Sequence, residues 1–278
     1  MPPVFEIPVF SAAAAAVVVD HGATRLEINR AGSYVAGGLT PTLAEVESIS
    51  KAVCVPLRVM IRPRGPPSSG EPDFLYSDTE FQQMCHELDA FVASGLLQPA
   101  RGDGFVFGIL KSDRDGHLSV DVDRNRQLVQ AAGPYACVIH RAFDLVLGDG
   151  GEAAVKEALR VLHECGCTGV LTAGGPGSRG AIEHAGTLQK LVATGRAANA
   201  SSKHIEIVIG GGVRSSNVGL LAGKVLTGSC SASSSSLVAF HSSCLADAAA
   251  AINHGAEGES VSGDEVAQIR DVLASLNV

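Results

Sequence analysis

Short apolar runs alternate with helical patterns along the whole chain. The apolar runs predict eight strands: Val4–Phe10, Thr24–Asn29, Val55–Ile61, Gly104–Leu110, Ala136–His140, Gly169–Ala173, Ile205–Ile209 and Val238–Ser243. The helical patterns predict eight helices: Ala12–His21, Thr42–Val53, Asp78–Ser94, Val122–Ala132, Glu152–Cys165, Ile182–Ala197, Ser215–Ala222 and Asp264–Leu276. Eight strands that are each followed by a helix are typical of a (β/α)8 TIM barrel. We therefore predict an α/β fold with a single barrel domain over residues 1–278.

A doubly wound open sheet is the alternative, but no Gly-x-Gly-x-x-Gly turn follows the first strand. Ser77 with Glu80 has the spacing of a capping box at the start of the third helix. Two stretches interrupt the regular alternation, and we interpret both as loop insertions, at about 65–73 and 225–237. The first is rich in Pro and Gly, and the second contains a run of serines.

Composition narrows the possible partners and the compartment. The formal net charge of −8 argues against nucleic acid or an anionic membrane surface as a partner. The apolar run Ala12–Val19 lacks a preceding basic residue, so it does not resemble a signal peptide. Seven scattered cysteines do not form a disulfide pattern and favour a reducing compartment. We expect a cytoplasmic protein that does not span a membrane.

Polar residues on the predicted strands indicate where the chemistry lies. Side chains on a barrel strand alternate between the interior and the helices. In the second strand Leu26 and Ile28 share the outer face, which turns Glu27 and Asn29 inward. The same alternation, with the polar residues at the strand ends, predicts a cluster at the mouth of the barrel: Glu6, Glu27, Arg62, His140, Asp144 and His241. Arg25 and Arg58 also point inward but lie deeper, so we expect them to be structural.

Charges inside a barrel are costly unless they are paired. The carboxylates, the guanidinium and the imidazoles of the predicted cluster can pair with one another around the mouth. Such a set suits a metal ion or a small anionic substrate. The alternative is a network of structural ion pairs without chemistry.

The glycine-rich segment after the seventh strand predicts an anion site. Glycines let the backbone approach a ligand, and the next helix offers free N–H groups at its N-terminus. We assign this site to Gly211, Gly212 and Arg214, with Ser242 after the last strand. A tight strand-to-helix turn alone also explains these glycines.

Cys165 and Cys167 form a Cys-x-Cys pair between the fifth helix and the sixth strand. Thiolates are natural ligands of Cu(I). The pair falls at the bottom of the predicted barrel, away from the mouth, and ordinary packing is the alternative interpretation.

Several motifs together resemble the CutC family, which is named for copper homeostasis. They keep the family order over nearly the whole chain: Glu6-Ile7, Arg25-Leu26-Glu27, Gly37–Pro41, Ile61–Gly65, Asp73–Asp78, Gly104–Gly108, His140–Asp144, Val170–Gly174 and Phe240–Ser243. The resemblance implies a cytosolic (β/α)8 barrel that forms a homo-oligomer, a dimer or a tetramer. It also implies copper handling, with Cu(I) binding proposed for some members.

The sequence departs from that family where copper matters. Members carry a cysteine after the Glu-Ile of the first strand and another after the Leu-Glu of the second. Here these positions hold Pro8 and Asn29, which do not replace thiolates as Cu(I) ligands. His140 and His241, with a carboxylate, remain candidates for Cu(II) or Zn²⁺.

Three functions are therefore open. The first is a copper-binding homeostasis protein, which the resemblance favours. The second is a barrel enzyme that acts on a small phosphorylated or carboxylated metabolite, with Glu27 or His140 as general base and Arg62 stabilising negative charge. The third is a scaffold that uses the outer helices, which the polar strand ends argue against.

Overall fold

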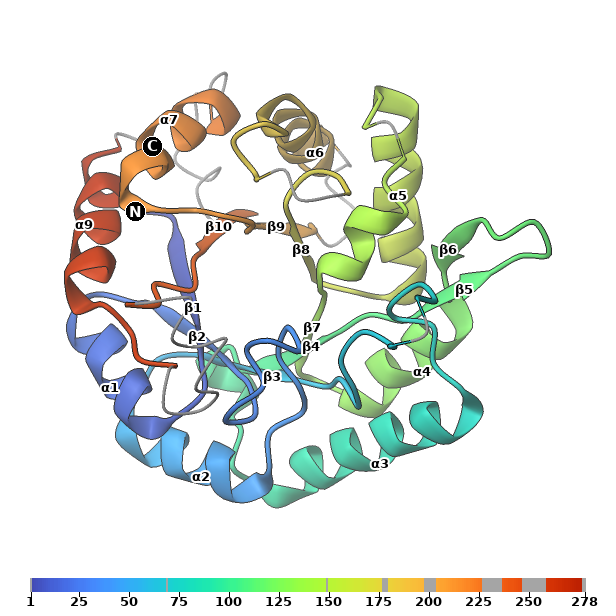
Figure 1. Ribbon diagram of the computed structural model, residues 1–278, viewed down its shortest axis with the longest axis horizontal. Coiled ribbons are helices and arrows are strands. Elements are labelled where there is room, and N and C mark those ends of the chain that lie inside the picture. Colours follow the sequence, from blue (N-terminus) through green and yellow to red (C-terminus); the bar gives the residue numbers. More distant parts are fainter. Residues whose placement is uncertain are drawn as a thin grey trace.

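Eight parallel strands close into a barrel in the order β1-β10-β9-β8-β7-β4-β3-β2, and helices surround it (Figure 1). The computed structural model describes residues 2–68, 70–148, 150–176, 180–197, 204–226, 237–246 and 259–276. The barrel strands are β1 (Val4–Val9), β2 (Arg25–Ile28), β3 (Leu57–Met60), β4 (Gly104–Phe107), β7 (Ala136–Ile139), β8 (Gly169–Thr172), β9 (Glu206–Ile209) and β10 (Val238–His241). The predicted TIM barrel is confirmed.

The outer helices begin and end close to the predicted positions. They are α1 (Ala12–Asp20), α2 (Leu43–Ala52), α3 (Asp78–Ser94), α4 (Val122–Ala132), α5 (Glu152–Cys165), α6 (Ala185–Ala197), α7 (Ser215–Leu226) and α9 (Gly263–Ser275). The capping box of Ser77 and Glu80 is present at the start of α3. No helix in the described part of the chain is both long and apolar enough to cross a bilayer.

Strand alternation divides the side chains between two apolar clusters. Outward residues such as Ile7, Leu26 and Ile139 pack with helix residues in the main core. A second, small cluster lies inside the barrel and contains only strand residues: Met60, Val106, Val138 and Leu171. Polar residues that the alternation turned inward, such as Glu6, Arg25, Glu27 and Arg58, are also buried.

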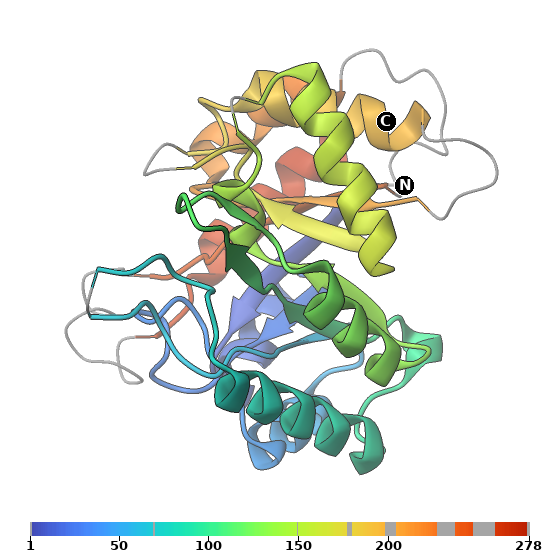
Figure 2. The same cartoon turned by 90° about the vertical axis from the view of Figure 1, so that its right-hand side faces the viewer.

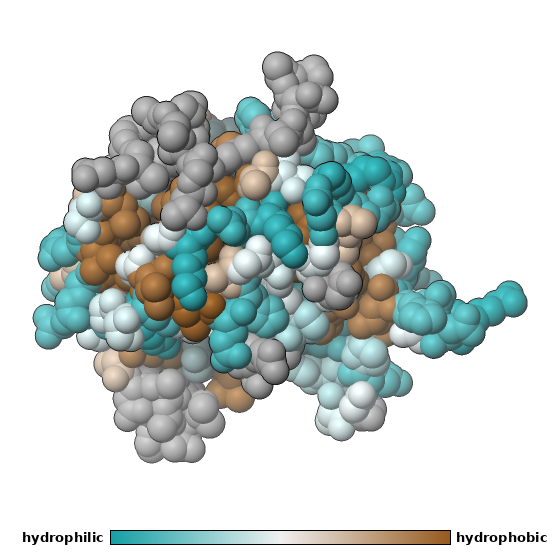
Figure 3. Space-filling view, turned by 90° about the horizontal axis from the view of Figure 1, so that it is seen from above, coloured by the Kyte–Doolittle hydropathy of each residue, from teal (hydrophilic) through white to brown (hydrophobic). Residues whose placement is uncertain are grey.

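Two features of the fold escape the sequence pattern. The predicted fourth strand ends at Phe107, and Leu110 begins a separate hairpin of β5 (Leu110–Ser112) and β6 (Leu118–Val120). This hairpin projects from the ring of helices as a hydrophilic arm (Figures 1 and 3). A short 3-10 helix, η1 (Pro99–Arg101), precedes β4, and a second, η2 (Arg141–Leu145), follows β7.

The loops that follow the strands gather at one end of the barrel (Figure 2). The stretch at 65–73 belongs to the loop between β3 and α3. The second predicted insertion begins too early, because residues 225 and 226 belong to α7, where Val225 and Leu226 are buried. Residues 227–236, with the serine run, lie outside the described residues.

Candidate functional site

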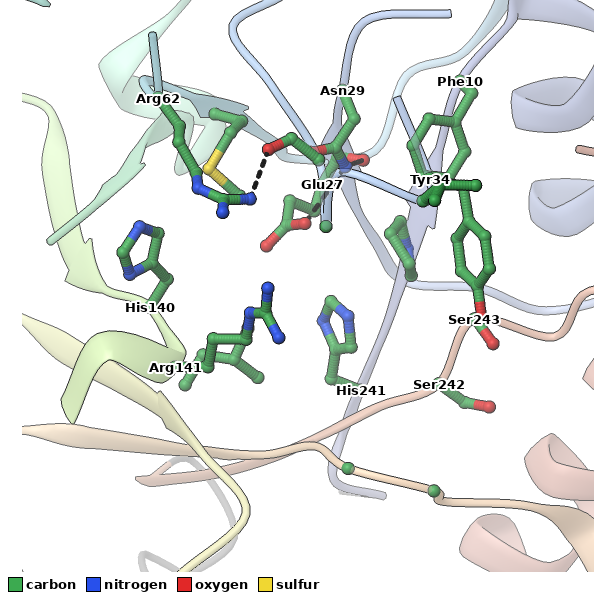
Figure 4. A pocket seen from close by; sticks show the side chains of 18 of the residues that line it. Phe10, Glu27, Asn29, Tyr34, Arg62, His140, Arg141, His241, Ser242 and Ser243 are labelled. Atoms are coloured by element: carbon green, nitrogen blue, oxygen red, sulfur yellow. Dashed lines mark hydrogen bonds between the residues drawn. The ribbon is translucent and has the colours of Figure 1, made fainter. Parts of the chain in front are cut away.

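A pocket of about 670 Å³ opens at the carboxyl ends of the barrel strands, where TIM-barrel enzymes hold their active sites. Its polar wall contains one carboxyl group, two imidazoles and three guanidinium groups (Figure 4). These come from Glu27, Arg62, His140, Arg141, Arg214 and His241. Apolar walls come from Phe10, Met60, Phe74 and Leu171. The size and the mixed lining suit a small polar ligand.

Glu6 is the centre of a buried ion-pair network next to the pocket, which His241 lines but Glu6 does not. The parallel register places Glu6 opposite His241 on β10 and opposite Arg25 on β2. The Glu6 carboxylate accepts hydrogen bonds from Arg25 Nε at 2.5 Å and His241 Nδ1 at 2.8 Å. Arg25 also pairs with Glu206 at 2.9 Å. The sequence had not indicated Arg25 as the main partner of Glu6.

The network shifts the pKa values of Glu6 and His241 in opposite directions. Burial by itself raises the pKa of Glu6, but Arg25 and His241 outweigh it and hold this pKa below its ordinary value. Burial lowers the pKa of His241, but the hydrogen bond to Glu6 and the charge of Glu27 outweigh burial and raise it. The structure thus favours a Glu6 carboxylate that is paired with a protonated His241.

Glu27 has a different environment one strand away. Asn29 Nδ2 donates to Glu27 Oε1 at 3.1 Å, while Oε2 is buried and has no partner among the described residues. Burial raises the pKa of Glu27, and the nearby charge of Glu6 adds to this effect. A carboxyl group with a raised pKa that lines a pocket is suited to general acid–base chemistry.

His140 lies across the pocket from the Glu6 network and is neutral. Burial lowers its pKa well below the ordinary value, and the charges of Arg62 and Arg141 lower it further. Its Nδ1 accepts a hydrogen bond from the Ala142 N–H at 3.3 Å. The proton therefore resides on Nε2, which is buried without a partner among the described residues. This tautomer makes His140 a hydrogen-bond donor toward a ligand rather than a base.

The structure separates Arg62 and Asp144 from the paired carboxylates. Arg62 does not pair with Glu6 or Glu27 as we expected, because Asp73 in the loop after β3 lies 2.8 Å from its Nη2. Asp144 is buried in η2 but does not line the pocket. It accepts hydrogen bonds from the Thr172 hydroxyl and the Ala173 N–H, so it joins η2 to the end of β8.

Among the charged residues that line the pocket, Arg141 is the one that the sequence interpretation missed. Its guanidinium points into the pocket between His140 and His241 (Figure 4). Within the described part of the chain it makes no hydrogen bond or ion pair, and its guanidinium carbon lies 5.7 Å from the centre of the Phe74 ring. The signal was present, because Arg141 directly follows the predicted site residue His140 at the end of a strand.

The glycine-rich loop after β9 reaches the pocket as predicted. Gly211 and Gly212 both have positive φ angles, and their N–H groups donate to no described residue. Arg214 Nη1 and Nη2 lie 3.1 and 3.2 Å from the Ser242 and Ser243 hydroxyl oxygens. Arg214 has no carboxylate partner among the described residues.

One part of the anion-site prediction was wrong. We expected the N-terminus of the following helix, α7, to offer free N–H groups. The side chain of Glu265 in α9 instead binds the first residue of α7, Ser215. Its carboxylate accepts hydrogen bonds from the Ser215 N–H at 2.8 Å and the Ser215 hydroxyl at 2.7 Å. The Ser215 N–H is therefore taken, whereas the loop N–H groups and Arg214 remain for a ligand.

Candidate metal donors occur at three places in the described chain: Glu6, Glu27 and His241 at the mouth, Asp113, Asp115 and His117 in the exposed β5–β6 hairpin, and the pair Cys165 and Cys167. Donor atoms of Glu6, Glu27 and His241 lie within 4.8 Å of one another, and His140 belongs to no such cluster in the described chain. Arg25 and His241 already balance the Glu6 charge, so we assign Glu6 and His241 to the ion-pair network and not to a metal site. Pro8 and Asn29 line the pocket, and no cysteine does so among the described residues.

Cys165 and Cys167 are buried at the opposite end of the barrel strands, at the end of α5 and before β8. Each thiol shifts the pKa of the other. A hydrogen bond to Cys167 lowers the pKa of Cys165, and the same bond together with burial raises the pKa of Cys167. The pair is separate from the mouth.

Comparison with known proteins identifies the family of this chain. The CutC family model matches residues 4–236. A family protein CutC from Chromobacterium violaceum is 32% identical over 271 residues, covering 96% of this chain and 93% of that protein. One from Salmonella enteritidis is 32% identical over 213 residues, covering 77% and 73%. A solved CutC structure from Streptococcus agalactiae, provisionally named for copper homeostasis, has a TM-score of 0.67 at 22% identity and covers 86% of this chain and 98% of its own. This chain belongs to the CutC family.

Proposed function

We propose that this chain is an enzyme that binds a small phosphorylated or carboxylated metabolite at the barrel mouth and transfers a proton through Glu27. One observation carries the proposal. Among the described residues, Glu27 is a buried carboxyl group with a raised pKa and one oxygen without a partner, in a pocket whose unpaired charge is positive. A negatively charged ligand would balance that charge beside the proton-transfer group.

The other pocket residues have distinct roles in this proposal. Gly211, Gly212 and Arg214 hold the anionic group of the ligand. His241, kept protonated by Glu6, can donate a proton. Glu27 accepts one in its ionised form and returns it later in the cycle. His140 serves as a hydrogen-bond donor, since its available nitrogen already carries a proton.

Exchange of ligand protons with solvent tests the proposal. Phosphorylated and carboxylated metabolites that stabilise the purified protein would be incubated with it in D2O and followed by NMR. We expect deuterium to enter a ligand with the wild type, and Glu27→Gln to lower the rate by about 10²-fold or more. A Glu183→Gln variant, outside the pocket, serves as the control. If no anionic metabolite or phosphate binds, the proposal is wrong.

Copper binding is a second candidate function, and it is separate from the mouth. The sulfur atom that the described chain presents to the mouth is the Met60 thioether, and the mouth does not fit Cu(I), which prefers thiolates. The interacting thiols of Cys165 and Cys167 provide the donor type that Cu(I) prefers. The free thiols of the six described cysteines also support a reducing compartment such as the cytoplasm.

Anaerobic Cu(I) titration of the reduced protein tests this second candidate. We expect one equivalent to bind to the wild type and none to bind tightly to the Cys165→Ser/Cys167→Ser variant. A Cys54→Ser variant is the control, because Cys54 is exposed and remote from the pair in sequence. Equal binding by all three proteins would exclude the pair as the copper site.

A further inference from the structure

The pocket holds a second concentration of positive charge, away from the glycine-rich loop. The guanidinium groups of Arg62 and Arg141 approach each other over Gly37, which has a φ of +81°. Arg141 Nη2 and Arg62 Nη1 both lie within 3.0 Å of the point where a Cβ atom on Gly37 would stand. A side chain at this position would therefore displace Arg141.

The nearby acidic groups do not balance both arginines. Asp73 binds Arg62 at 2.8 Å, and it also lies 3.9 Å from Arg64. His140 is neutral and adds no negative charge. Arg141 therefore has no ion-pair partner among the described residues, and burial and the charge of Arg62 lower its pKa, which the charges of Asp73 and Asp144 offset only in part. An anion that entered the pocket would offset the repulsion between the two arginines.

A second donor stands beside Arg141. The Nε2–H of His140 is buried and has no partner in the described chain, and His140 is 3% exposed. A buried donor without a partner costs free energy that a ligand oxygen would recover. The Phe74 ring packs against His140 with a centroid distance of 4.7 Å and holds the imidazole in position.

The two positive regions occupy different arcs of the barrel. Arg62 and His140-Arg141 follow β3 and β7, whereas Gly211, Gly212 and Arg214 follow β9. In the strand order β8 separates β7 from β9 on one side, and β10, β1 and β2 separate β9 from β3 on the other. Figure 4 shows Arg62, His140 and Arg141 on one side, Ser242 and Ser243 on the other, and His241 between them.

We propose that Arg141 and His140 form a second anion subsite, so that the substrate is a short molecule with an anionic group at each end. This inference rests on the proposed function, because it extends the same pocket. One end binds at Gly211, Gly212 and Arg214, and the other binds at Arg141. The atoms between the two ends then lie over Glu27 and His241.

Inorganic phosphate and linear ligands test the second subsite. Calorimetric titration should find two phosphates bound to each wild-type chain, and one bound to Arg141→Gln or to Arg214→Gln. An alkane-1,n-diyl bisphosphate should bind the wild type about tenfold or more tighter than the matching alkyl monophosphate. Arg141→Gln should lose that preference. Arg114→Gln, in the exposed hairpin arm, is the matched control and should behave as the wild type.

The possible results separate the two proposals. A single phosphate that Arg214→Gln abolishes and Arg141→Gln retains would overturn the second subsite and leave the proposed function intact. No phosphate binding by any variant would overturn both proposals. Urea denaturation of each variant confirms folding. Arg141→Gln should be at least as stable as the wild type, because Arg141 makes no hydrogen bond in the described chain and its removal relieves the repulsion from Arg62.

Discussion

Replacement of Glu6 by glutamine tests how much the buried ion pairs inside the barrel contribute to stability. The substitution keeps the shape of the side chain and removes the negative charge between Arg25 and His241. Glu6 is 3% exposed and accepts hydrogen bonds at 2.5 Å from Arg25 and at 2.8 Å from His241. The variant therefore leaves two buried cationic groups without their shared partner.

The size of the stability loss depends on the interactions that Arg25 and His241 keep in the variant. Removing one member of a buried ion pair costs about 3–5 kcal/mol, because a buried charge remains uncompensated. Arg25 still pairs with Glu206, at 2.9 and 3.1 Å. His241 can lose its proton and become neutral. We therefore expect the free energy of unfolding to fall by about 3 kcal/mol, the lower end of that range.

The loss should depend on pH. The folded-state pKa of Glu6 is lowered, so its contribution is present above the ordinary value of 4.5 and is lost as the pH falls. The pKa of His241 is raised, so its contribution is present below the ordinary value of 6.5 and is lost as the pH rises through the folded-state pKa. The difference between the wild type and Glu6→Gln should therefore be largest between these values and smaller at alkaline pH.

Urea denaturation at a series of pH values, with NMR titration of the His241 ring, measures both effects. Glu206→Gln is the matched control, since it removes the other partner of Arg25 but does not touch His241. Glu206→Gln should lower the free energy of unfolding, but this decrease should not change with pH as His241 titrates. A change below about 1 kcal/mol for Glu6→Gln, or an unchanged His241 pKa, would refute the reasoning.

Three further predictions concern single groups. Burial raises the pKa of Glu27, so the contribution of Glu27 to wild-type stability is lost as the pH rises above 4.5. In urea denaturation, the free energy of unfolding of Glu27→Gln should therefore increase relative to that of the wild type as the pH rises. Asp103 is 1% exposed and binds Arg101 and two backbone N–H groups, so Asp103→Asn should cost about 3 kcal/mol in the same assay. Glu265→Gln should cost about 1 kcal/mol, measured by thermal unfolding, because its carboxylate caps α7 at Ser215; no change would contradict that role.

Local patterns determined most of the fold. Strand and helix positions follow from residues that are close in sequence, as do the capping box at Ser77 and the inward direction of Glu27 and Asn29. The β5–β6 hairpin was missed because Ile109 and Leu110 follow the apolar residues of β4 with only Gly108 between them. A period-2 pattern identifies a strand but does not identify its partners.

The partners of the charged residues depended on closure of the barrel. Glu6 and His241 are 235 positions apart, and only the register of β1 and β10 brings them together. The loop between β3 and α3 gave Asp73 to Arg62, and the packing of α9 beside α7 placed Glu265 at Ser215. Arg141 has no ion-pair partner among the described residues. The sequence thus determined which side chains face the interior. Which of them are neutralised, and which remain for a ligand, was decided by distances between remote segments, because electrostatic pairing depends on separation in space.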